Sequence, residues 1–194
     1  MAKTAATGFY FRKSLVGVEH PSTIDIILAG SATVKIGDLV RVNTSGLLVR
    51  CATTEAPAGV LVGIVDRNGI NVFSPRASGT TGSTLTPDDQ IATSSTNATD
   101  ATRNLKGQVV LDPAGTNLWY NDADDTLAQA NLFQLFDVAN GNQVTVAGAS
   151  DATGEVQLIV IDPDGDGDVS KGLFRIAESQ FGGILDNATA KVAA

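Results

Sequence analysis

The sequence has few of the residues that usually carry chemistry. Cys51 is the only cysteine and His20 the only histidine among 194 residues. This excludes an intrachain disulfide and leaves a metal site or catalytic triad without its usual partners. Cys51 ends an apolar stretch, where a free cysteine behaves as a small core residue. His20 precedes Pro21 in a polar segment, and we expect it at the surface or at an interface.

Basic clusters and long apolar runs are missing too. The 13 Lys and Arg residues are outnumbered by 21 Asp and Glu residues. Because phosphate binding needs a basic patch, no nucleic-acid partner is expected. The longest apolar runs, such as 60–65 and 158–161, are far too short to cross a bilayer. The N-terminal MAKTAATGFYF lacks the apolar core of a secretion signal. We therefore expect a protein that is made in a reducing cytosol and has no membrane partner.

The residues that are present favour strands. Charged residues make up 18% of the chain and aromatic residues 5%, whereas there are 20 glycines and many Ser and Thr residues, as is typical of strands joined by turns. At 43% hydrophobic, the chain can bury one good core or two small ones. The prediction is a mainly β fold: a β-sandwich or β-barrel-like domain, or two such domains, with long loops and at most one short helix.

Local patterns place the first strands. Residues 9–11 and 24–28 alternate with the period of two that half-buried strands show. The turn sequence NTSG within 32–52 predicts a hairpin there. Residues 60–73 predict a second hairpin, because a buried strand runs into the turn sequence RNG.

The strand pattern continues in the second half. Asp124 and Asp125, followed by good helix formers, predict one or two helical turns over 124–131. Residues 133–138 fit a helix or a strand. Further strands are expected at 108–111, 118–120, 144–147, 156–161 and 172–180.

The chain thus divides into five parts. A small polar stretch suits an arm that orders against a neighbouring subunit, and a long Ser-, Thr- and Gly-rich stretch suits a contact loop that orders on assembly. In order, the expected parts are a flexible N-terminal arm at 1–12, a β-domain at 13–73, the loop at 74–107, a β-rich second half packed on the first at 108–185, and a C-terminal tail at 186–194.

One motif has the spacing of a metal-binding loop. Asp162, Asp164, Asp166 and Asp168 alternate, with glycine at the sixth position, as in the first half of a calcium loop of the EF-hand type, where carboxylates converge on one hard cation. The twelfth position, usually a bidentate Glu, is Leu173. The alternative interpretation is an acidic, Gly-rich turn that needs no ion. If calcium binds here, its role is structural, and no other cofactor is expected.

We expect no catalytic or cofactor-binding residues, and therefore not an enzyme. The acids at 88–89 and 122–125 lie beside turn residues, which suits solvated loops or helix caps more than acid–base catalysis. Trp119 and Tyr120 suit a core anchor or a subunit contact better than a base-stacking platform in so acidic a protein.

Three segments between residues 30 and 73 form a recognisable pattern. The sequence TVKIGDLV at 33–40 opens a strand, GLLV at 46–49 and Ala52 follow in a short hairpin, and VLVGIV at 60–65 closes a small β-domain. This pattern resembles a module of capsid decoration (cement) proteins of tailed bacteriophages. The rest of the chain fits that family in kind, with its polar arm, its Ser/Thr/Gly-rich loop and its β-rich second half.

The resemblance implies a structural protein of the virion, located on the capsid exterior and synthesised in the host cytoplasm. It would bind the assembled head, often as a homotrimer, and stabilise the capsid by clamping neighbouring copies of the major capsid protein. Interface burial and strand addition, with no chemistry, would do this. Phe9, Tyr10 and Phe11 are the expected interface anchors, since aromatic residues often dominate interface energetics.

Two other functions stay open. A major tail or head-closure protein would also be β-rich and acidic, and would form rings or tubes in place of trimers. A calcium-dependent adhesion or carbohydrate-binding module would use the aspartate loop and Trp119, although the missing signal peptide counts against it.

Overall fold

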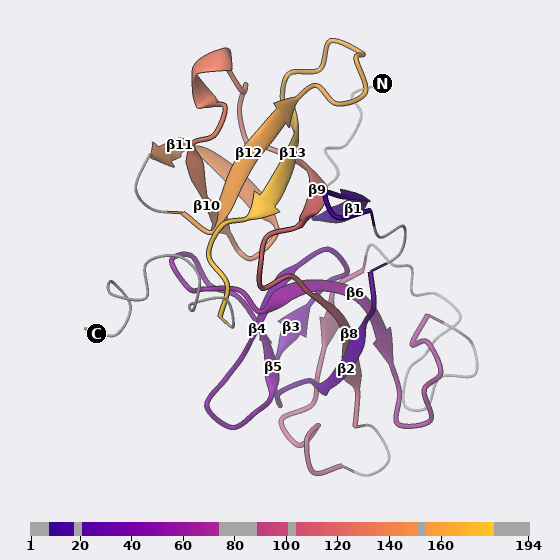
Figure 1. Cartoon of the computed structure of the whole chain (residues 1–194). Coiled ribbons are helices and arrows are strands. Elements are labelled where there is room, and N and C mark those ends of the chain that lie inside the picture. The colour runs from indigo at the N-terminus through magenta and orange to yellow at the C-terminus, as the bar shows by residue number, and fades with distance from the viewer. Residues whose placement is uncertain (1–7, 18–20, 74–88, 101–103, 151–153, 181–194) are drawn as a thin grey trace.

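The computed structural model describes residues 8–17, 21–73, 89–100, 104–150 and 154–180. Its strands are antiparallel and form two main sheets. This confirms the predicted mainly β class. No helix in the described parts of the chain is long and apolar enough to cross a membrane. The two sheets form separate layers, one above the other in Figure 1.

The strands of each sheet follow a defined order. The six-stranded sheet has the order β1 (Tyr10–Ser14), β9 (Asn117–Asp122), β13 (Lys171–Ile176), β12 (Val156–Ile161), β10 (Leu135–Ala139) and β11 (Gln143–Ser150). The five-stranded sheet has the order β2 (Ile24–Ile27), β8 (Lys106–Leu111), β6 (Gly59–Val65), β4 (Leu39–Val42) and β5 (Leu48–Arg50). A small third sheet pairs β3 (Thr33–Val34) with β7 (Ile91–Ala92).

Each main sheet takes one strand from the other half of the sequence. Strand β1 pairs with β9, with Tyr10 opposite Tyr120, and strand β8 lies between β2 and β6. Residues 10–12, predicted as part of a flexible arm, are therefore strand residues of the six-stranded sheet. The boundary between the sheets also differs from the predicted one. Most of β8 lies in the predicted second half, 108–185, but β8 belongs to the five-stranded sheet with β2, β4, β5 and β6.

The five-stranded sheet is buried on both faces. Leu39 and Val60 face the six-stranded sheet, whereas Val40 and Leu61, one residue further along the same strands, face a second apolar cluster. Successive residues of a strand point to opposite faces, so burial on both sides requires an unbroken apolar run. The run at 60–65 was predicted as a buried strand for this reason, and β6 confirms it.

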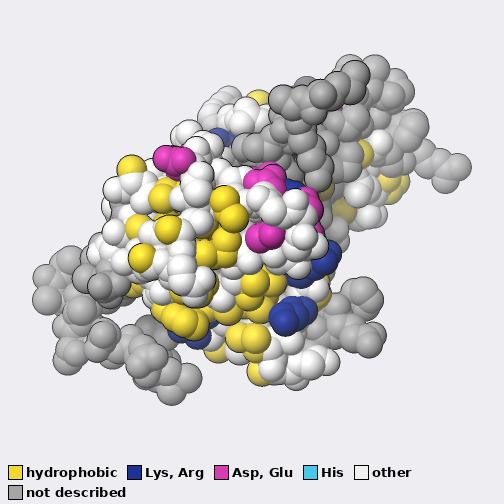
Figure 2. Space-filling view, turned by 90° about the horizontal axis from the view of Figure 1, so that it is seen from above, with side chains coloured by type: hydrophobic (Ala, Val, Ile, Leu, Met, Phe, Trp, Pro, Cys, Tyr) yellow, Lys and Arg dark blue, Asp and Glu magenta, His cyan; other side chains and the backbone are white. Residues whose placement is uncertain are grey.

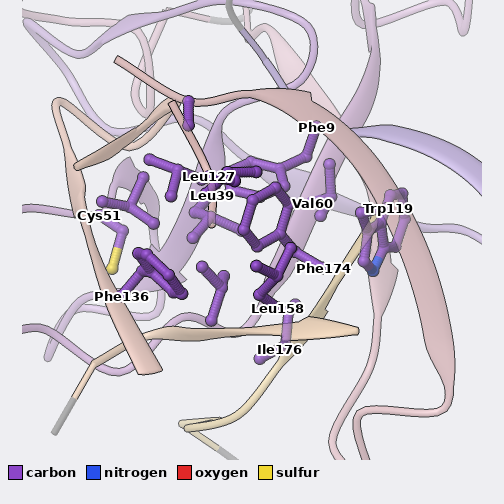
Figure 3. Packing of buried hydrophobic residues seen from close by; sticks show 14 of the residues in the cluster. Phe9, Leu39, Cys51, Val60, Trp119, Leu127, Phe136, Leu158, Phe174 and Ile176 are labelled. Carbon is purple, nitrogen blue, oxygen red and sulfur yellow. The ribbon is translucent and has the colours of Figure 1, made fainter. Parts of the chain in front are cut away.

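The first apolar cluster joins the two main sheets. Figure 3 shows Leu39 and Val60 of the five-stranded sheet beside Phe136 and Phe174 of the six-stranded one. The ring of Phe174 meets Phe9 and Phe136 edge to face, at centroid distances of 6.5 and 6.0 Å. Pairs with this geometry add about 0.5–1.5 kcal/mol beyond area burial. The two sheets therefore share one core.

Both predicted hairpins are present, each held by an Asx-type turn. In the β4–β5 hairpin, the Asn43 side chain accepts hydrogen bonds from the backbone N–H groups of Ser45 (2.9 Å) and Leu47 (3.0 Å). After β6, the Asp66 carboxylate accepts the N–H groups of Asn68 and Ile70. The second arm of this later hairpin is shorter than predicted, a single bridge pairing with Val65.

The helix predicted over 124–131 is reduced to one 3₁₀ turn, η1 (Gln129–Asn131). Asp124 accepts the backbone N–H of Val146 on β11, and the backbone N–H of Leu127 donates to Val169. These bonds hold the segment extended between strand β11 and the β12–β13 loop, so the favourable helix propensity of its residues is overridden. The ambiguous stretch 133–138 is mostly strand, because β10 begins at Leu135.

The described parts of the predicted loop pack against the five-stranded sheet. Ile91 and Leu105 belong to the second apolar cluster. The buried Asn97 side chain donates to the carbonyl of Leu28 (2.7 Å) and accepts the N–H of Leu105 (2.9 Å). This portion therefore forms structure within one subunit, whereas residues 74–88 and 101–103 lie outside the described residues.

Two glycines on β6 allow a matched test of the sheet packing. A Cβ at Gly59 would overlap the backbone carbonyl of Val110 on β8, which cannot move without breaking the ladder, whereas a Cβ at Gly63 would meet only the end of the Gln108 side chain. We expect Gly59→Ala to lower the free energy of unfolding by about 1–3 kcal/mol and Gly63→Ala to be close to neutral, as measured by urea unfolding. Equal effects of the two substitutions would contradict the packing described here.

Candidate functional site

The acidic loop between β12 and β13 is organised by its own hydrogen bonds. The carboxylate of Asp162 accepts the backbone N–H groups of Asp166 (3.1 Å) and Gly167 (2.9 Å). The carboxylate of Asp168 accepts both the backbone N–H (3.2 Å) and the hydroxyl (2.6 Å) of Ser170. Carboxylates that satisfy backbone groups in this way are typical of tight turns.

A lysine supplies the positive charge of this loop. The Lys171 side chain is 4% exposed, and its ammonium donates to Asp166 and lies 3.4 Å from Asp168. The hydrogen bond from Lys171 lowers the pKa of Asp166, and the hydrogen bonds from Ser170 lower the pKa of Asp168. The remaining acid, Asp164, forms an exposed ion pair with Arg12 of β1 at 3.1 Å.

This geometry bears on the predicted calcium site. Among the residues that the structure describes, no three acidic, histidine or cysteine side chains come together as a group that could hold a metal ion. Leu173, at the position where an EF-hand has its bidentate Glu, is buried in strand β13. Of the two interpretations of the loop, the geometry favours the turn that needs no ion, because the Lys171 ammonium already contacts both Asp166 and Asp168.

The predicted interface anchors lie largely within the subunit. Phe9 is 2% exposed and belongs to the core between the sheets, and Phe11 packs edge to face on Trp119 at 5.8 Å. Tyr10 is half-buried. Phe9 and Phe11 thus pack against the core of their own subunit, and a contact of Phe11 or Tyr10 with a partner stays a prediction.

A buried carboxylate that sequence reasoning missed lies where the sheets meet. Asp38 is fully buried and accepts the backbone N–H of Lys35 (2.7 Å), the guanidinium Nε of Arg50 (2.9 Å) and the side-chain amide of Asn142 (3.0 Å). Asn142 lies in the β10–β11 turn, so this network crosses between the sheets. Desolvation raises the pKa of Asp38 even though the positive charge of Arg50 opposes the shift.

Glu155 is a second missed carboxylate at the same boundary. It is 2% exposed and accepts the backbone N–H groups of Val138 (2.8 Å) and of Thr54 in the β5–β6 loop. Burial raises its pKa. A sequence signal did exist for both residues: each is a lone acid directly before an apolar run, at Leu39 and at Val156. We call these two networks the polar seam.

The structure places Cys51 as predicted, in the core. Its side chain is 2% exposed, and its thiol donates to the carbonyl of Glu55 at 3.0 Å. Desolvation and the nearby negative charge of Glu55 raise the pKa of Cys51 to about 12, so the reactive thiolate is suppressed. His20 and Asp88 lie outside the described residues.

Other acidic side chains also have partners within the fold. Asp122 accepts the hydroxyl of Tyr120 at 2.9 Å, and Asp125 accepts the backbone N–H of the next residue. Trp119 is fully buried, as the core interpretation predicted, and its indole N–H donates to the buried Asp112 at 3.4 Å. These contacts give each group a structural role.

Replacing Lys171 tests the ion-free interpretation of the acidic loop. We expect Lys171→Met to lower the melting temperature and to return the pKa of Asp166 toward its ordinary value, measured by carboxyl-carbon NMR, because the hydrogen-bonded ammonium is lost. The wild-type melting temperature should stay unchanged in millimolar calcium. A rise in wild type that Asp164→Ala and Asp166→Ala abolish would establish the calcium loop instead.

Replacing Arg50 tests the polar seam. Arg50→Met leaves the buried Asp38 without its cation and should lower the free energy of unfolding by about 3 kcal/mol at neutral pH, the low end for a buried pair because Arg50 keeps some solvent contact. A raised pKa means that the folded state binds the Asp38 proton more tightly than the unfolded state. The loss of unfolding free energy caused by Arg50→Met should therefore grow as the pH rises from about 4 to about 7 and Asp38 becomes charged.

The control for this substitution is Arg41→Met. Arg41 pairs with Glu55 at 2.6 Å, and both side chains are about one-third exposed. Such pairs contribute about 0–1 kcal/mol, so this variant should stay close to wild type in urea unfolding. If the two variants behave alike at all pH values, Asp38 does not depend on Arg50.

Comparisons of this chain with protein-family models, with curated proteins and with solved structures found no match. Function must therefore be inferred from the residues and geometry given above.

Proposed function

We propose that this chain is a viral structural protein, a capsid decoration (cement) protein that binds the outer surface of a tailed-phage head and clamps neighbouring capsomers. The observation that carries the proposal is the three-segment pattern within residues 30–73. Its segments supply β3, β4, β5 and β6, and the last three of these are neighbouring strands of the five-stranded sheet.

The architecture supports a mechanical role. The five-stranded sheet has apolar clusters on both faces, and the polar seam joins it to the six-stranded sheet. A protein that resists the separation of capsomers must transmit force without deforming, and closely packed interiors have low compressibility. The expected partners are the major capsid protein and two further copies of this chain in a trimer.

The alternatives receive different support. A major tail or head-closure protein fits the same fold, and assembly into rings or tubes would identify it. A carbohydrate-binding module is less well supported, because Trp119 is fully buried and cannot stack on a sugar, and because Lys171 lies between Asp166 and Asp168 of the acidic loop.

Binding to heads tests the proposal. The heads are purified from a deletion mutant of the phage whose genome encodes this chain. They should bind the purified protein saturably in co-sedimentation and withstand higher temperature once decorated. Light scattering of the free or released protein should give three times the chain mass of 19.9 kDa. A protein that never sediments with heads contradicts the proposal, and tubes or rings in electron micrographs would favour the tail or head-closure function.

A further inference from the structure

An exposed aromatic side chain sits on an unusual backbone. Phe133 has a φ of 66° and is 65% exposed. A bulky residue in the left-handed region is a conformational outlier, and such outliers persist only where the surrounding structure imposes them. Here the backbone N–H of Phe133 donates to the carbonyl of Leu158 (2.9 Å), and its carbonyl accepts the side-chain amide of Gln157 (2.7 Å). The backbone of Phe133 is thus held in place while its side chain is exposed to solvent.

This ring belongs to a larger surface that we call the crown, formed by residues 123–134 and 162–170. Both loops lie at one end of the six-stranded sheet (Figure 1), and they are joined by backbone hydrogen bonds from Ala123 to Ser170 and from Leu127 to Val169, each 2.9 Å. Val169 is 41% exposed. Figure 2, which views this end, shows apolar side chains gathered next to Asp and Glu side chains.

The second half of the sequence, which supplies the crown, carries most of the negative charge of the chain. Residues 112–180 contain twelve Asp or Glu residues and two Lys or Arg residues, whereas residues 1–111 contain eight acidic and ten basic residues. Asp124 and Asp125 on the crown are exposed. An apolar centre with an acidic border is complementary to a partner surface that has an apolar recess with a basic border, and it disfavours acidic partners.

We infer that the crown is the docking surface for a basic protein partner, with Phe133 as the anchor. This inference rests on the proposed function, under which the partner surface is the outer face of the major capsid protein. A backbone held in place before binding loses little conformational freedom on docking, and aromatic anchors surrounded by a polar border are typical of binding hot spots. The acidic border makes the association sensitive to salt.

The test uses a substitution that favours the observed backbone. Asparagine tolerates the left-handed conformation better than phenylalanine, so Phe133→Asn should keep the melting temperature of wild type or raise it while removing the ring. We expect its affinity for undecorated heads to fall about tenfold or more. The matched control is Val16→Asn, since Val16 is also 65% exposed but follows β1, outside the crown; it should bind as wild type does.

The outcomes separate this inference from the proposed function. If wild type and Phe133→Asn bind heads equally, the crown is not the docking surface, although the decoration function stands. If wild type fails to bind, the decoration function itself fails. Loss of the trimer in Phe133→Asn with unchanged head binding would overturn the inference by assigning the ring to contacts between copies. The double substitution Asp124→Asn and Asp125→Asn should reduce the salt dependence of head binding. An unchanged salt dependence would contradict the role of the acidic border in docking.

Discussion

Leu39 and Val60 of the five-stranded sheet pack against Phe136 and Phe174 of the six-stranded sheet, and the other features of the molecule are arranged around this contact. Burying both faces of the five-stranded sheet requires apolar residues at successive strand positions, which limits where polar groups can lie. It also requires close approach of the β10–β11 turn, where a Cβ at Gly141 would come within 3.0 Å of the Leu39 carbonyl. The shared core thus makes the two sheets one mechanical unit.

The polar seam makes the packing of the two sheets more specific than apolar contacts alone would, because hydrogen bonds require particular partners in particular positions. Asp38 and Glu155 are both buried and both accept hydrogen bonds from elements of the opposite sheet or its loops. Burial raises the pKa of each, because desolvation disfavours the charged carboxylate. Buried polar groups of this kind can select one docking arrangement over others, because any shift would leave them without partners.

The proposed decoration function makes use of this division of roles. The interior gives a rigid body, while the surface loops at one end of the six-stranded sheet present the Phe133 ring and an acidic border. Phe9, and Phe11 of strand β1, which the resemblance suggested as anchors, pack against the core of the subunit itself. If the protein clamps capsomers, its strength comes from this rigid body and its selectivity from the crown.

Much of the fold could be predicted from local patterns, because turns and strands are set by neighbouring residues. Asn43 and Asp66 organise the two hairpins through bonds within four residues of themselves, and the apolar run at 60–65 specified a strand buried on both sides. The sequence could not reveal which strands become neighbours, since β1 and β8 each join the sheet of the other half through contacts distant in the chain. At the acidic loop, tertiary structure adds a contact that the spacing of the aspartates does not reveal. Its spacing fits a calcium ligand set, but Lys171, held in place by strand β13, provides the positive charge there.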